Sequence, residues 1–178
     1  YSAEDGVVGD WHVVHLGSRA MGGAGLVIAE MSAVHPDGRI SIRDAGIWDD
    51  KHTEPWKRVV DFVHENTDSK IGIQLGHSGR KADTGLSWQR GTDAQMEYGF
   101  DIVAPTAIPV SERARTPRVI TDEEITALPG LYKRATERAE EAGFDVLNFH
   151  CAHGYLMSSF ISPLSNHRND ELGGPLEN

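Results

Sequence analysis

The chain of 178 residues is 39% hydrophobic and 25% charged, a composition typical of one globular domain, residues 1–178. A formal net charge of −10 argues against a nucleic-acid partner, because binding phosphates requires a basic surface. The sequence has no apolar run of membrane-spanning length and no signal pattern, and its single cysteine cannot form an internal disulfide, so we expect a cytoplasmic protein without a membrane partner.

The first two segments predict a helix followed by a buried strand. Asp10 can cap a helix that runs to Met21, and the pair Gly22-Gly23 can close it. Residues 25–34 (GLVIAEMSAV) then form an apolar, β-prone run. A strand that follows a helix stop after a short joint is typical of an α/β unit.

A second helix and strand repeat this order. The helix is expected to open at Asp49 or Asp50, with Pro55 in its first turn, where proline is tolerated. Its apolar stripe consists of Trp56, Val59, Val60 and Val63. Residues 70–77 (KIGIQLGH) follow as the second strand, and the glutamine inside this apolar run, Gln74, needs a hydrogen-bonding partner.

A long link without clear periodicity joins the second strand to the third helix. Because residues 78–120 leave the carboxyl end of a strand, they are expected to form a lid or wall of an active site. The third helix opens at Thr121, where Thr121-x-x-Glu124 is a capping box. Pro129 lies inside its pattern, so we expect a kink or a restart near Gly130.

The third strand, residues 145–150, is short and almost wholly apolar, as expected for a strand buried on both faces. His150 stands at its carboxyl end, and His153 and Tyr155 follow at the spacing His-x-x-His-x-Tyr. Because α/β folds bind ligands at this end of their strands, the three groups are expected to converge on one site. The spacing alone leaves two other roles open: the histidines could bind loop carbonyls, or could ligate zinc together with Cys151.

Strands and helices that alternate with short joints indicate parallel βα units. No G-x-G-x-x-G follows any of the three strands, which disfavours a doubly wound dinucleotide-binding sheet. A (β/α)8 barrel has eight strands and typically ~250 residues, so the three strands predict an α/β fold that is an incomplete (β/α)8 TIM barrel. The chain begins at Tyr1 rather than at methionine, and we expect it to be the N-terminal part of one longer barrel domain.

Three motifs resemble those of a known family. QLGHSGRK (Gln74 to Lys81), HCAHGYL (His150 to Leu156) and SPLSNHRNDELGG (Ser162 to Gly174) occur in the order found in the old yellow enzyme family of FMN-dependent ene-reductases. The segment GDWHVVHLGSRAMGGAGLVIAE resembles the bacterial YqjM-like (xenobiotic reductase) branch, so the similarity covers the whole chain. The resemblance implies a (β/α)8 barrel that binds FMN at the carboxyl end of its strands.

The resemblance also implies catalytic roles for the polar loop. His150 and His153 correspond to a pair that donates hydrogen bonds to the carbonyl of an enone or to a phenolate above the flavin, so that His150 also lies at the cofactor. Hydride arriving at the β-carbon places negative charge on that oxygen, which the two donors stabilise. Tyr155 corresponds to the proposed donor of a proton to the α-carbon.

Other positions correspond to cofactor and substrate contacts. Gln74 matches a glutamine that binds the flavin pyrimidine edge, since an amide offers a donor and an acceptor. Met31 matches a position beside the flavin that often holds a small residue or threonine. Tyr1 matches a tyrosine that reaches the substrate pocket. Asp170 is expected to brace its loop by pairing with Arg168 or a neighbouring residue.

The sequence therefore predicts an oxidoreductase in which NADPH or NADH gives hydride to FMN, and the activated C=C bond of an α,β-unsaturated carbonyl compound is then reduced. The expected partners are this small molecule and, at full length, further copies of the protein in a homo-oligomer. Three alternatives remain: the reductase half of a bifunctional salicylyl-CoA hydroxylase-type protein, a metal-dependent barrel hydrolase using His150 and His153, and an inactive fragment of the barrel.

Overall fold

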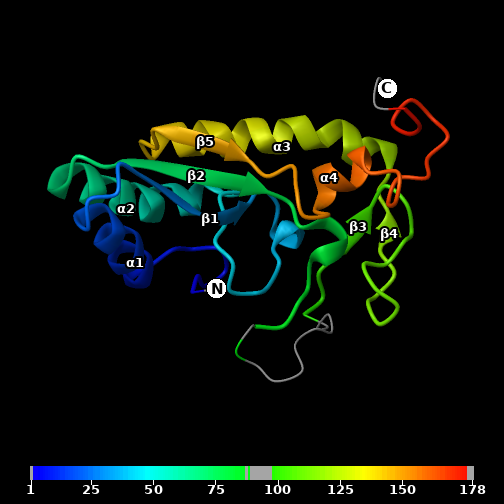
Figure 1. Ribbon diagram of the computed structural model, residues 1–178, viewed down its shortest axis with the longest axis horizontal. Helices are drawn as coiled ribbons and strands as arrows, with labels where there is room; N and C mark the ends of the chain where they lie inside the picture. The colour runs from blue at the N-terminus through cyan, green and yellow to red at the C-terminus, as the bar shows by residue number, and fades with distance from the viewer. Residues whose placement is uncertain (1, 87, 89–97, 176–178) are drawn as a thin grey trace.

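The computed structural model describes residues 2–86, 88 and 98–175, in which helices and strands alternate as predicted. In chain order the main elements are α1 (Asp10–Met21), β1 (Leu26–Ala33), α2 (Thr53–Asn66), β2 (Lys70–Gly76), α3 (Asp122–Glu141) and β5 (Val146–Phe149) (Figure 1). The link between β2 and α3 contains β3 (Val103–Ala104) and β4 (Arg118–Val119), and α4 (Leu156–Ile161) follows β5. Within these described ranges, no helix is long and apolar enough to span a membrane.

The three predicted strands form one parallel sheet in the order β1-β2-β5. The pairing of β1 with β2 is irregular between Ile28 and Met31. Beyond this irregularity, Met31, Gln74 and Asn148 are partners in register and form a row across the sheet. Residues in register on parallel strands point to the same face, so the row presents three side chains to one face.

The main hydrophobic core lies between the opposite face of the sheet and the helices. β2 contributes Ile71, Ile73 and Leu75, all with no exposed surface. The core residues of α2 and α3 are Trp56, Val59, Val60, Val63, Tyr132, Ala135 and Ala139, which include the whole predicted stripe of α2. Because side chains alternate along a strand, Gln74 points away from this core.

The first two helices begin close to the predicted residues. Gly9, with extended backbone (φ −136°), is the N-cap of α1, so the predicted cap at Asp10 is wrong by one residue. The Asp10 carboxylate instead pairs with Arg58 of α2, 2.6 Å away. Asp49 caps the short 3-10 turn Asp50–His52 that leads into α2, and Pro55 lies in the first turn of that helix, as predicted.

The third helix runs without interruption through Pro129, so the predicted restart near Gly130 is wrong. The capping box of Thr121 and Glu124 is present at its start. Tyr132, Ala135 and Ala139 then bury the second half of the helix against the core. This packing stabilises the helix beyond the backbone hydrogen bond that the proline removes, since helices in proteins depend mainly on tertiary contacts.

β5 is not buried on both faces, contrary to the prediction. It is the edge strand of the described sheet, and Leu147 and Phe149 remain 36% and 47% exposed. Phe149 contacts Tyr132 of α3 across 5.9 Å between ring centroids. An apolar run identifies a strand, but the number of covered faces depends on neighbouring elements that the run does not encode.

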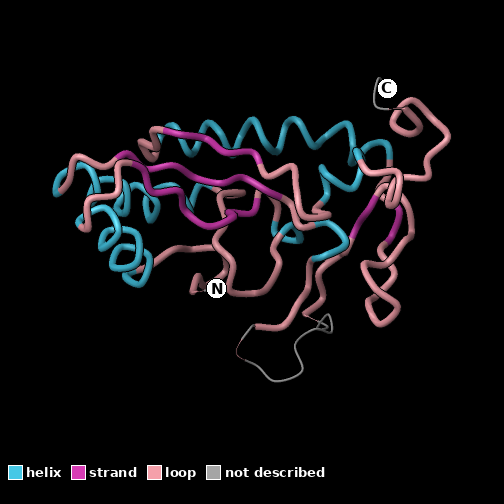
Figure 2. The backbone as a smooth tube through the Cα atoms, in the orientation of Figure 1, coloured by secondary structure: helices cyan, strands magenta, loops and turns pink. Residues whose placement is uncertain are grey.

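The link after β2 has more regular structure than its sequence suggests (Figure 2). A 3-10 turn, Gly79–Lys81, follows the strand, and β3 pairs with β4 in parallel. The buried carboxylate of Asp83 accepts a hydrogen bond from the Tyr98 backbone and pairs with Arg115 at 2.5 Å, which fastens two distant parts of the link together. The predicted lid or wall falls partly on residues 87 and 89–97, which lie outside the described residues.

Candidate active site

His150 is the first residue after β5, and only 8% of it is exposed. Its backbone N–H donates to the Leu75 carbonyl at 2.9 Å, which continues the pairing of β5 with β2. The backbone N–H of Ala152 donates to Nδ1 of the His150 ring at 3.2 Å. Nδ1 therefore presents its lone pair, and the neutral ring carries its proton on Nε2.

The Nε2 atom of His150 lies 3.2 Å from Nδ1 of His153. Because His150 carries its proton on Nε2, it donates and His153 accepts. A ligand oxygen beside both nitrogens would receive two hydrogen bonds if His153 moved its proton to Nδ1. Burial, and then repulsion from His153, lower the pKa of His150, so the neutral ring is favoured.

Tyr155 completes a cluster of three rings. Its ring centroid lies 4.5 Å from that of His150 and 6.4 Å from that of His153. Tyr155 is also the N-cap residue of α4, so the start of that helix fixes its backbone. The three side chains of the His-x-x-His-x-Tyr motif therefore lie together, as predicted, while their catalytic roles stay predictions.

The row across the sheet supplies a second set of polar groups. Nε2 of Gln74 donates to Oδ1 of Asn148 at 2.8 Å. Among the described residues, Oε1 of Gln74 and Nδ2 of Asn148 form no hydrogen bond, so one acceptor and one donor remain. Met31 ends the row and lies against Gly76, beside His150.

Two residues of this region had no predicted role. Asn148 stands out in the sequence only as the polar exception in an apolar strand, and its place beside Gln74 follows from the register of the two strands. Lys81 donates to the backbone carbonyl of His153, a contact between loops that no local pattern encodes.

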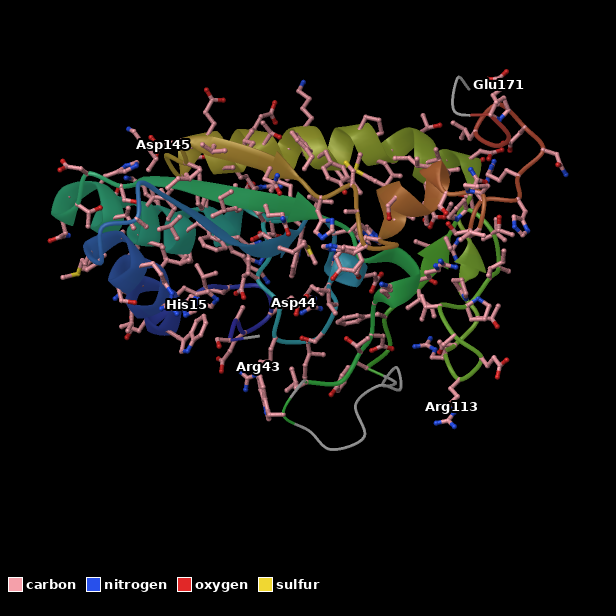
Figure 3. The ribbon with its side chains drawn as sticks, viewed as in Figure 1. His15, Arg43, Asp44, Arg113, Asp145 and Glu171 are labelled. Atoms are coloured by element: carbon pink, nitrogen blue, oxygen red, sulfur yellow. The ribbon has the colours of Figure 1, made fainter. Side chains whose placement is uncertain are left out.

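An ionic cluster fixes the opposite end of β5. The Asp145 carboxylate, labelled in Figure 3, accepts a hydrogen bond from the Ile71 backbone at 2.9 Å and pairs with His64 at 2.8 Å and Lys70 at 3.0 Å. Burial alone would raise the pKa of Asp145, but these hydrogen bonds lower it to about 2. The cluster holds β5 in the register that places Asn148 beside Gln74.

The loop after α4 is braced as predicted. Nε of Arg168 donates to Asp170 at 2.9 Å, and the same guanidinium also pairs with Asp122, in the first turn of α3, at 2.8 Å. Arg168 therefore ties this loop to the amino end of α3.

The remaining site predictions concern a zinc ion bound with Cys151, and Tyr1. Cys151 is exposed, with its Sγ 3.7 Å from the sulfur of Met157. In the described part of the chain, no three histidine, cysteine or acidic side chains are placed to hold a metal ion, so the zinc alternative gains no support there. Tyr1 lies outside the described residues, and its place in a substrate pocket stays a prediction.

Comparison with known proteins gives the family of the chain. A family model described as the NADH:flavin oxidoreductase / NADH oxidase family matches residues 1–178. The chain is 47% identical to an NADPH dehydrogenase of Bacillus velezensis and 46% identical to one of Bacillus subtilis, in each case over 175 residues, 98% of this chain and 47% of the relative. The chain thus spans about half the length of the curated relatives it matches.

Solved structures agree with this result. Morphinone reductase superimposes with a TM-score of 0.85 at 30% identity, over 99% of this chain and 48% of that one. An Old Yellow Enzyme from Pichia sp. AKU4542 gives a TM-score of 0.83 at 31% identity, over 99% and 46% of the two chains. With the parallel strands and their helices, these likenesses confirm the predicted incomplete (β/α)8 barrel.

Proposed function

The chain belongs to the NADH:flavin oxidoreductase / NADH oxidase family, and on this premise we propose that the protein is an FMN-dependent oxidoreductase that uses NADPH or NADH to reduce the activated C=C bond of an α,β-unsaturated carbonyl compound. The observation that carries the proposal is the convergence of His150 Nε2 and His153 Nδ1, 3.2 Å apart, beside the Tyr155 ring. Two ring nitrogens this close together can both donate to the oxygen of a polarised carbonyl once His153 carries its proton on Nδ1.

The row of sheet residues fits the flavin. Gln74 and Asn148 offer an acceptor and a donor side by side, which matches the alternating carbonyl and N–H groups of the pyrimidine edge. Met31 offers an apolar surface for the flat ring, and His150 closes the same face at the strand end. The chemistry that FMN supplies when bound is hydride transfer, first from reduced nicotinamide and then to the β-carbon of the substrate.

The histidine pair binds and polarises the substrate oxygen. Negative charge develops on that oxygen as hydride reaches the β-carbon, and hydrogen-bond donors beside the oxygen stabilise the charge. The backbone N–H of Ala152 holds the donor proton on Nε2 of His150. His153 supplies the second hydrogen bond through Nδ1, which lies 3.2 Å from that Nε2 atom and carries the ring proton in this role.

Tyr155 supplies the proton. The α-carbon becomes basic once hydride has arrived, and a phenol can transfer its Oη proton to such a carbon while remaining protonated at rest. The O–H bond of Tyr155 breaks as the α-carbon C–H bond forms, and a proton from water restores the phenol. The position of the ring against His150 favours this role.

The experiment uses the protein expressed at its natural full length. We expect a purified yellow protein whose visible flavin absorbance bleaches with NADPH or NADH without oxygen and returns on addition of 2-cyclohexen-1-one, with about one equivalent of cyclohexanone formed. A Tyr155→Phe variant should retain bleaching but lose about 10²- to 10⁴-fold in the rate of reoxidation. A colourless protein, or a flavin that the enone does not reoxidise, would contradict the proposal.

A further inference from the structure

The turn that carries His153 has an unusual backbone conformation. His153 has φ 59° and Gly154 has φ 71°, so two successive residues occupy the left-handed region. Glycine adopts this conformation freely, but for histidine it is unfavourable and persists only where surrounding contacts hold it. The direction in which the His153 and Tyr155 side chains leave the backbone depends on this turn.

Lys81 contacts this turn, which the Tyr155 N–H also closes by donating to the Ala152 carbonyl at 3.2 Å. Lys81 lies in the 3-10 turn after β2, and its Nζ donates to the His153 carbonyl at 2.5 Å. A Cβ on Gly154 would lie 3.5 Å from Cε and 3.7 Å from Nζ of Lys81, so the lysine packs along the turn as well. Its Nζ is 5.9 Å from the centre of the Tyr155 ring.

The support for Lys81 is itself fixed by neighbouring contacts. The Leu156 backbone N–H donates to the His77 carbonyl at 2.9 Å, and a Cβ on Gly79 would lie 3.0 Å from Cα of Leu156. The Ser78 hydroxyl donates to the carbonyls of Gly38 and Arg39, at 2.9 and 2.8 Å. The loop after β2 is therefore a rigid base for the loop after β5.

Among the described residues, no carboxylate pairs with the ammonium group of Lys81. By contrast, Lys51, Lys57 and Lys70 each form an ion pair with a carboxylate. An ammonium group that is not neutralised stabilises negative charge on a neighbouring group. The nearest catalytic candidate on which such charge would develop is Tyr155 after it gives up its proton.

We propose that Lys81 is a positioning residue of the active site: it holds the left-handed turn at His153–Gly154 through the His153 carbonyl, and so sets the directions of His153 and Tyr155. This inference rests on the proposed function for its catalytic consequence. That Lys81 holds the turn at His153–Gly154 does not depend on the proposed function.

The test compares Lys81→Met, Lys81→Arg and the surface control Lys57→Met in the full-length protein with its flavin. Methionine keeps the length of the side chain but removes the donor and the charge, whereas arginine keeps both. We expect Lys81→Met to reduce flavin with NADPH or NADH at the normal rate and to be reoxidised by 2-cyclohexen-1-one about 10- to 100-fold more slowly, because small displacements of a reacting group have effects of this size. Lys81→Arg should recover most of the loss, and Lys57→Met should match the unmodified protein.

Hydrogen exchange, measured by mass spectrometry on the same variants, reports how often the backbone of the turn opens. Amides of residues 152–158 should exchange at least about fivefold faster in Lys81→Met than in Lys57→Met, as expected when a local contact that limits opening is lost. Unchanged exchange would overturn the inference whatever the activity shows. Faster exchange with no effect on the rate of reoxidation would overturn the catalytic role of Lys81. If the enone does not reoxidise the unmodified protein, the proposed function is rejected, and the exchange result alone decides whether Lys81 holds the turn.

Discussion

Met31 of β1 and Gly76 of β2 occupy complementary space: a Cβ at position 76 would lie 2.8 Å from Cγ and 3.0 Å from Sδ of Met31. The same atom would lie 3.4 Å from Cβ of His150. The methionine thus fills the volume that any larger residue at position 76 would need, directly beside the first candidate catalytic residue. The sizes of these two residues must be considered together.

Gly76→Ala should destabilise the protein by about 1–3 kcal/mol, the usual effect of overpacking, because the added methyl group displaces the Met31 side chain. Met31→Ala should destabilise it through the cavity that the shorter side chain leaves. The double variant should be more stable than the sum of the two effects predicts, by at least about 1 kcal/mol, since the new methyl group fills part of the cavity. Urea unfolding of the four proteins measures this coupling, and additive effects would show that the two side chains do not compete for space.

The histidine pair predicts unequal effects of two similar substitutions. Asparagine places its amide where the Nδ1 atom of histidine was. In His153→Asn the amide N–H₂ can take the position that faces His150 and the ligand oxygen. In His150→Asn the amide can only reproduce the contact with the Ala152 backbone, and the donor at Nε2 is lost.

Binding of 4-hydroxybenzaldehyde to the flavin-containing protein distinguishes these cases. We expect the dissociation constant to rise about 10- to 100-fold in His150→Asn, the loss of one hydrogen bond to a charged oxygen, and less than about fivefold in His153→Asn. His167→Asn, an exposed site, serves as the control. Equal losses in the two variants would indicate that His153 donates through another atom than Nδ1.

His77 should make stability depend on pH. It is 5% exposed, and burial first, then repulsion from His35, lower its pKa to about 3. Between pH 6.5 and 3 the unfolded chain binds a proton at this histidine and the folded chain does not, so stability falls as the pH falls through this range, by about 1.4 kcal/mol per pH unit. The stability that depends on a neutral His77 is fully present above pH 6.5.

His77→Asn isolates this contribution, because its amide oxygen can still accept the Gly79 N–H that now binds Nδ1. Urea unfolding between pH 6 and 4.5 should show a slope of stability against pH that is smaller by about 1.4 kcal/mol per unit than in the unmodified protein. The His167→Asn control should keep the original slope. An unchanged slope in His77→Asn would mean that His77 can be protonated in the folded state.

The sequence predicted those features that depend on local pattern. The strand ends at Gly76 and Phe149, the capping box at Thr121 and the packing stripe of α2 follow from periodicity and turn chemistry, and the structure confirms them within one or two residues. The clustering of His150, His153 and Tyr155 followed from the same logic, because residues after a strand end share one edge of the sheet.

Features that depend on contacts between distant segments could not be read in this way. The contact of Lys81 with the His153 carbonyl joins residues 72 positions apart, and the pair of Gln74 and Asn148 requires the register of two strands. The exposed face of β5 depends on which elements cover it. These properties arise from tertiary packing, which overrides or completes local preference.

Pro129 gives a test of how tertiary packing offsets local preference. As an interior residue of α3 it cannot donate to the carbonyl of Ile125, and proline is about 3 kcal/mol less favourable than alanine inside a helix. Pro129→Ala restores the donor but also gives the unfolded chain more freedom, which offsets about 0.4–1 kcal/mol of the gain. We therefore expect the free energy of unfolding to rise by about 1–2 kcal/mol.

Gly130→Ala is the matched control, because a Cβ there would meet only Nη1 of Arg134, at 3.6 Å. It should stabilise the helix by about 1 kcal/mol through propensity alone. Pro129 lines a pocket together with Ile125 and Phe160. If Pro129→Ala is neutral or destabilising while Gly130→Ala stabilises, the proline ring contributes to the tertiary packing that keeps α3 continuous.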